Sequence, residues 1–170
     1  MRAETHIGIA LASAALLTAW TAPPGLGQVA ALVAGSVLPD IDYPYAPAGR
    51  LLTLPPSLDP RLGSRGRDHY PWHRKLTHTL AAVLGLLGLA VFYRGGGGWI
   101  AWLTLGYLTH LLADTLTPWG VPWLWPLEPW AKRHRWAMIG VESQEERLLA
   151  GAAWLVVSLA IAIRLIQGFV

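Results

Sequence analysis

Six side chains of metal-ligand type stand at the ends of long apolar stretches, namely His6, Asp40, His73, His78, His110 and Asp114. Titratable groups near a hydrocarbon region cost free energy unless they are paired, so each marks a candidate functional site. The 170 residues include no cysteine, which excludes a disulfide framework, a thiolate zinc site and a cysteine nucleophile. Any metal in this protein would therefore be held by nitrogen and oxygen ligands.

The clearest local pair is His110 and Asp114, four residues apart near the end of an apolar run. In an α-helix this spacing places both side chains on one face, where they can share an ion. Thr117, about one turn further on, would lie on the same face. A core histidine beside a carboxylate shows the same spacing, so the pair alone leaves both interpretations open.

Two further pairs flank other apolar runs: Asp40 with Asp42, and His73 with His78. The two histidines can face one site only if His73 precedes the first helical turn, which Pro71 favours. A charged membrane boundary would explain His73 but not His78, which lies inside the apolar run. For the two aspartates, the alternative is a turn or capping role.

The composition predicts that the elements positioning these residues are membrane helices of a single domain, residues 1–170. Apolar residues make up 54% of the chain and charged residues only 14%, compared with about 25% charged in an ordinary globular domain. Three apolar runs have the length of a membrane crossing, at 76–93, 99–117 and 148–166. Two shorter runs, 7–22 and 25–38, would form a thin or tilted hairpin, although the second could be re-entrant.

The basic residues predict the orientation of such a bundle. With five crossings, the amino terminus and the segments 39–75 and 118–147 share one side, and all 13 basic residues except Arg94 and Arg164 fall there. The positive-inside rule makes that side cytoplasmic. Helix ends that carry His6, Asp40, His78, His110 and Asp114 would then meet at this face. A polyanion-binding patch is the alternative explanation of the basic residues, but no specific nucleic-acid binding is predicted.

The fold class is therefore all-α, a polytopic membrane bundle of four to five helices with two cytoplasmic loops. The first loop, 43–72, is rich in proline, and the second, 118–136, interleaves proline with tryptophan. Neither composition is compatible with a regular helix. The indoles of the second loop suit the lipid headgroup layer.

Imidazole and carboxylate donors together suit Zn²⁺, with Mn²⁺ as the alternative, and one or more ions. Such a centre activates water for an in-line displacement. Arg74 would bind the substrate anion, and Asp42 is a second candidate catalytic residue. Asp42, Thr77 and Thr117 would orient the ligands from behind.

Four blocks of this sequence resemble the YdjM-type inner-membrane proteins, and together they cover most of residues 3–127. The blocks are Thr5-His6, Leu38-Pro39-Asp40-Ile41-Asp42, His73-Arg74-x-x-Thr77-His78 and Gly106-Tyr107-x-x-His110-x-x-x-Asp114-x-x-Thr117-Pro118-Trp119-Gly120-Val121-Pro122. The resemblance implies a membrane-bound metal-dependent hydrolase, remotely similar to zinc-dependent phospholipase C and S1/P1-type nucleases. Phosphoester hydrolysis is its expected activity, by analogy of fold.

The chain departs from the family pattern at two places. Tyr43 stands where many relatives have a histidine, so any ligand role there is lost or moved. Before the last apolar run, Glu142, Glu145 and Glu146 have no clear match to the family's glutamate element. One of the three could be a ligand or a base, whereas acids at this place usually interact with the helix dipole.

The function predicted from these observations is a metal-dependent hydrolase of the inner (plasma) membrane. It would be multi-pass, with its site facing the cytoplasm, and would act on a phosphoester such as a membrane lipid headgroup. Two alternatives use the same residues without hydrolysis: a metal or proton carrier, and a structural membrane protein. A carrier would place its ligands near the bilayer midplane, whereas these residues lie at helix ends.

Overall fold

The computed structural model describes residues 1–43, 46, 74, 76–93, 98–129 and 132–168. This part of the chain is all-helical, as predicted, with an isolated β-bridge between Val121 and His134 and no β-strand. Its elements are α1 (Ala3–Leu17), α2 (Leu26–Val37), the 3₁₀ helix η1 (Leu38–Asp42), the 3₁₀ helix η5 (Leu76–His78), α3 (Leu80–Phe92), α4 (Trp99–Thr115) and α5 (Gln144–Gln167).

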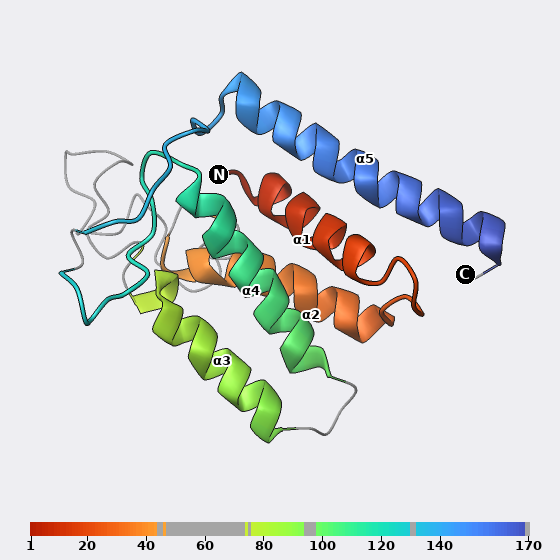
Figure 1. Cartoon of the computed structure of the whole chain (residues 1–170), viewed down its shortest axis with the longest axis horizontal. Coiled ribbons are helices and arrows are strands. Elements are labelled where there is room, and N and C mark those ends of the chain that lie inside the picture. Colours follow the sequence, from red (N-terminus) through yellow and green to blue (C-terminus); the bar gives the residue numbers. More distant parts are fainter. Residues whose placement is uncertain (44–45, 47–73, 75, 94–97, 130–131, 169–170) are drawn as a thin grey trace, which may run out of the picture.

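Successive α-helices run in opposite directions along the bundle (Figure 1). The starts of α1, α3 and α5 therefore lie at the same end as the ends of α2 and α4. The helices α2 and α4 form the centre, α3 packs on α4, and α5 packs along α1 on the opposite side (Figure 1). The common end is the one at which the sequence predicts a site.

The central pair, α2 and α4, is packed backbone against backbone. A Cβ added to Gly35 would lie 2.0 Å from the carbonyl oxygen of Leu103, and one added to Gly106 would lie 2.1 Å from that of Leu32. Only glycine permits so close an approach, which is the way small residues join helices in membranes. The two glycines therefore set the register of α2 against α4.

Helix lengths differ from the predicted crossings. The run at 76–93 becomes a 3₁₀ turn followed by α3, because the Thr79 hydroxyl caps α3 by accepting from the Ala82 N–H. With only 12 residues, α2 reaches roughly 18 Å at about 1.5 Å per residue, less than a hydrocarbon core of about 30 Å. Among the described helices, α5 is the one that is long and apolar enough to cross a bilayer.

The two predicted loops have different outcomes. Segment 43–72 lies outside the described residues apart from Tyr43 and Ala46. Segment 118–136 contains no helix in its described part, as predicted, and folds back so that the Val121 and His134 backbones pair. This fold brings the segment beside the end of α4, where Val121 packs with Tyr107 and Leu111 in a buried apolar cluster.

Candidate metal centre

Five of the six predicted ligands meet at the common end of the bundle, whereas His73 lies outside the described residues. The start of α1 supplies His6, η1 supplies Asp40, η5 supplies His78, and the end of α4 supplies His110 and Asp114. Their ligand atoms form two overlapping groups, each with atoms within 4.8 Å of one another. The groups are His6–Asp40–His110 and His78–His110–Asp114.

The separations between these atoms fit ligands of a common ion better than direct hydrogen bonds. His110 Nε2 lies 3.5 Å from Asp40 Oδ1 and 3.8 Å from Asp114 Oδ2, and His78 Nε2 lies 3.6 and 3.7 Å from the same two oxygens. His6 Nε2 lies 3.5 Å from Asp114 Oδ1. Hydrogen bonds of this type are typically about 2.7–3.2 Å. Two ligands of a tetrahedral zinc ion, with bonds of about 2.0–2.2 Å, are roughly 3.3–3.6 Å apart.

Burial makes these separations costly without a cation. His6, His78, His110 and Asp114 are each at most 1% exposed. Among the described residues, neither ring nitrogen of His6 nor Nε2 of His110 has a hydrogen-bond partner. Buried polar atoms without partners are rare in folded proteins and call for an explanation such as a bound ion.

His110 is oriented by the backbone of α2. Its Nδ1 lies 2.8 Å from the carbonyl oxygen of Ser36, which can only accept, so Nδ1 carries the proton. In a neutral ring, Nε2 then has the lone pair and faces the oxygens of Asp40 and Asp114. Atoms that all accept need a proton or a metal ion between them. A histidine held in this way by its other nitrogen is typical of metal ligands.

A side-chain relay orients His78 in the same sense. Its Nδ1 lies 3.0 Å from Thr77 Oγ1, and that hydroxyl lies 3.1 Å from Asp42 Oδ2. Thr77 has one hydroxyl proton, which goes to the carboxylate, so His78 Nδ1 donates to Thr77. The Tyr107 hydroxyl also donates to the carbonyl oxygen of Thr77 and holds this turn against α4. Asp42 and Thr77 thus lie behind the cluster, and Nε2 of His78 points toward its carboxylates.

Asp114 is paired with two positively charged groups. Arg74 Nη2 lies 2.5 Å from its Oδ2, and the amino group of Met1 lies 3.1 Å from its Oδ1. Arg74 also donates to the carbonyl oxygen of Gly120 at 3.2 Å and to Thr117 Oγ1 at 3.4 Å. These contacts hold Arg74 at φ +60°, a costly conformation for a side chain with a Cβ. The predicted substrate residue Arg74 therefore contacts the candidate ligand Asp114 directly.

Asp40 is an anion in this environment. Burial by itself would raise the pKa of the Asp40 carboxyl, but without a metal ion the positive charge of a protonated His110 and hydrogen bonds from His110 and His78 hold that pKa well below its usual range. A carboxylate that is ionised and faces two imidazole nitrogens is ready to bind a cation.

Glu146 and the Ser36 carbonyl are two features that sequence reasoning missed. Glu146 is 1% exposed, and its carboxylate binds the start of α1, whereas Glu142 and Glu145 are exposed. The spacing of the three acids carries no signal that singles out the buried one. The Ser36 carbonyl is a backbone group, so its role follows only from the packing of α2 on α4.

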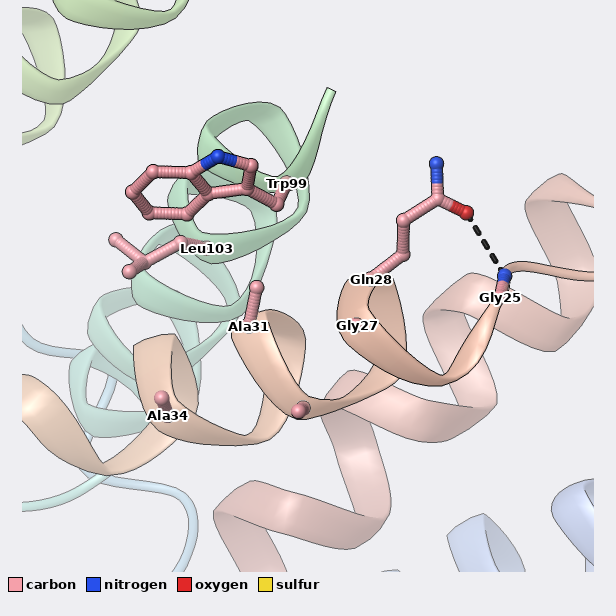
Figure 2. A pocket seen from close by; sticks show the side chains of 8 residues that line it. Gly25, Gly27, Gln28, Ala31, Ala34, Trp99 and Leu103 are labelled. Carbon is pink, nitrogen blue, oxygen red and sulfur yellow. Dashed lines mark hydrogen bonds between the residues drawn. The ribbon is translucent and has the colours of Figure 1, made fainter. Parts of the chain in front are cut away.

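An apolar groove of about 620 Å³ lies elsewhere, between the starts of α2 and α4 (Figure 2). Small residues such as Gly27 and Ala31 line it together with Trp99 and Leu103. Its polar side chain, Gln28, caps α2 by accepting from the Gly25 N–H at 2.9 Å (Figure 2). Because none of the candidate ligands lines this groove, the groove is not part of the metal centre.

A family model for the YdjM inner membrane protein matches residues 1–169 of this chain. The chain belongs to that family. Relatives named "Inner membrane protein YdjM", from Escherichia coli strain K12 and from Shigella flexneri, are each 36% identical over 140 residues. Each alignment covers 74% of this chain and 66% of the relative, just under two thirds of its length. No solved structure matches. The family match supports a location in the inner membrane and does not show a hydrolase activity.

Proposed function

We propose that this protein is a multi-pass, metal-dependent hydrolase that acts on a phosphoester at the cytoplasmic face of the inner membrane. The observation that carries the proposal is the buried cluster in which three imidazoles and two carboxylates meet with acceptor atoms facing one another. The membrane location comes from the family. The cytoplasmic side is inferred from the sequence, in which all basic residues except Arg94 and Arg164 fall in the segments next to the helix ends that carry the cluster.

His6, Asp40, His78, His110 and Asp114 would hold the ion, with His73 as a further predicted ligand. The two overlapping groups share His110, whose Nδ1 is engaged by Ser36 and whose Nε2 offers one lone pair. The two groups therefore cannot both be complete sites at once, which favours one tightly held ion. Zn²⁺ suits this donor set best, and Mn²⁺ is the alternative.

An ion in this cluster supplies Lewis-acid activation of water and of a phosphoryl oxygen. The chain's own residues would prepare that chemistry. Ser36 and the Thr77–Asp42 relay orient two imidazoles, so little reorganisation is needed when a substrate binds. Arg74 pairs with Asp114 and donates to the carbonyl oxygen of Gly120, and it would bind a phosphate oxygen of the substrate at the edge of the cluster.

The position of the cluster favours an enzyme over a carrier. All five ligands lie at or next to helix ends at one end of the bundle, and α5 begins at that end (Figure 1). A carrier needs its site near the bilayer midplane, where both sides can reach it in turn. A site at the membrane surface would instead meet lipid headgroups and their phosphoesters.

Metal analysis of detergent-purified protein tests the proposal. Wild type is expected to retain about one Zn²⁺ or Mn²⁺ per chain, and His110→Ala and Asp114→Ala are expected to lose it, because each removes a buried donor. His134→Ala is the matched control, since His134 pairs with Glu128 outside the cluster at 3.2 Å. Wild type that holds no metal and takes up none on addition would overturn the proposal. Metal binding without cleavage of a phospholipid or a generic phosphodiester would favour the carrier.

A further inference from the structure

Glu146 is a buried carboxylate that belongs to the last helix but binds the first. It lies in the first turn of α5 and is 1% exposed. Its Oε1 accepts from the Arg2 N–H at 2.6 Å and from the Thr5 hydroxyl at 3.1 Å, and its Oε2 accepts from the Glu142 N–H at 2.5 Å. Three donors to one buried carboxylate make this a specific contact between α5 and α1.

The contact replaces a cap that α1 lacks. The first N–H groups of a helix have no partners within the helix and need acceptors from elsewhere. The N-cap residue of α1, Arg2, makes no side-chain capping bond. Glu146 supplies the acceptor from α5 instead, and its negative charge also lies at the positive end of the α1 dipole.

His6 depends on this contact more than the other imidazoles do. Ser36 orients His110, and the Thr77–Asp42 relay orients His78. Among the described residues His6 has no hydrogen bond to either ring nitrogen, and its ring stacks on that of His110 with centroids 3.7 Å apart. Its position is therefore set by where α1 begins, and the preceding residue, Thr5, is bound by Glu146.

We propose that Glu146 is a positioning residue of the metal centre, which fixes the start of α1 so that His6 reaches the ion. The inference rests on the proposed function, because it assumes that the cluster binds a metal. It assigns to α5 a role beyond membrane anchoring, since the helix would then complete a site to which it contributes no ligand.

The far ends of the same two helices offer a control. Arg164 near the end of α5 donates to the carbonyl oxygens of Thr18 and Thr21 and to the Thr18 hydroxyl. This contact also joins α5 to α1, but it lies at the end of the bundle opposite the cluster (Figure 1). Loosening it should reduce stability without moving His6.

A double-mutant cycle on the full chain in detergent tests the proposal. Co²⁺ affinity is measured by its visible absorption, and the unfolding temperature is measured alongside, for wild type, Glu146→Ala, His6→Ala and the double variant. Glu146→Ala is expected to weaken Co²⁺ binding about 10- to 100-fold in wild type. It should weaken binding less than about twofold in the His6→Ala background, because the residue through which it acts is gone.

Two control variants and a conservative one complete the design. Glu145→Ala, which alters an exposed side chain, should change neither the Co²⁺ affinity nor the unfolding temperature. Arg164→Ala should lower the unfolding temperature but leave the Co²⁺ affinity unchanged. Glu146→Gln, which keeps one acceptor oxygen, should bind Co²⁺ with intermediate affinity, and it replaces Glu146→Ala in the cycle if the alanine variant does not fold. Equal loss of affinity in both backgrounds, or none in wild type, would overturn this inference alone. Failure of wild type to bind Co²⁺ or Zn²⁺ would overturn the proposed function and this inference with it.

Discussion

Gly106 of α4 rests on the carbonyl oxygen of Leu32 in α2, so closely that an added Cβ would lie 2.1 Å from it. This approach sets the distance between the two central helices. One turn after each of these residues, the Ser36 carbonyl receives the Nδ1 proton of His110 at 2.8 Å. A packing contact between two helices therefore determines how one candidate ligand is oriented.

Gly106→Ala should destabilise the protein, because the new methyl group must push α2 and α4 apart. Overpacking of this kind typically costs about 1–3 kcal/mol, and thermal unfolding in detergent measures it. Gly85→Ala in α3 is the matched control, since nothing lies within 4 Å of its added Cβ. Alanine there should leave stability unchanged or slightly raised. Equal stability of the two variants would contradict the close packing of α2 on α4.

Thr77→Val should weaken metal binding by about 10- to 100-fold, the usual effect of losing a group that orients a ligand. Valine keeps the shape of threonine but breaks the relay from His78 Nδ1 to Asp42 Oδ2. Calorimetric titration with Zn²⁺ measures the affinity. Thr104→Val is the control, because that hydroxyl donates to the carbonyl oxygen of Ile100 within α4, away from the candidate ligands. If the relay had no role in metal binding, Thr77→Val and Thr104→Val would bind Zn²⁺ with equal affinity.

Arg74→Gln should make the protein more dependent on metal for its stability. Arg74 pairs with buried Asp114 at 2.5 Å, and breaking a buried ion pair typically costs about 3–5 kcal/mol. A bound divalent ion would supply the missing positive charge. The rise in unfolding temperature on Zn²⁺ addition should therefore be larger in the variant than in wild type.

The control for that experiment is Arg135→Gln, because Arg135 is exposed and donates to the carbonyl oxygen of Pro118. Its metal-induced rise should equal that of wild type. If Arg74→Gln also gave the wild-type rise, Arg74 and the ion would not be acting on the same carboxylate.

The proposed orientation can be tested directly, because the natural chain has no cysteine and single cysteines can be introduced without other changes. Lys132→Cys marks the end of the bundle that carries the cluster, and Trp20→Cys, at a side chain 95% exposed, marks the opposite end. A membrane-impermeant maleimide should label the Lys132→Cys variant only in inverted vesicles and the Trp20→Cys variant only in right-side-out vesicles. Labelling of both variants from the same side would exclude the proposed crossings.

Much of the candidate centre was predictable because its signals are local. The spacing of His110 and Asp114 places them on one face of any helix, and apolar runs of helical length predict five helices that alternate in direction. The alternation brings His6, Asp40 and His78 to the same end, as the structure has it. The third apolar run predicts a helix from Leu76. The α-helix begins about one turn later, at Leu80, because residues 76–78 form the 3₁₀ helix η5 and Thr79 caps α3.

The tertiary structure decided which groups surround the ligands. Glu146 is buried while Glu145 is exposed, Arg74 faces Asp114, and a backbone carbonyl of α2 orients a ring of α4. These contacts join residues forty or more positions apart, and their partners are set by how closely α2 packs on α4 and α5 on α1. The sequence alone determined the kinds of donor and the helices that carry them, since composition and periodicity act within one segment. Pairing between segments depends on distances that only the packed bundle defines.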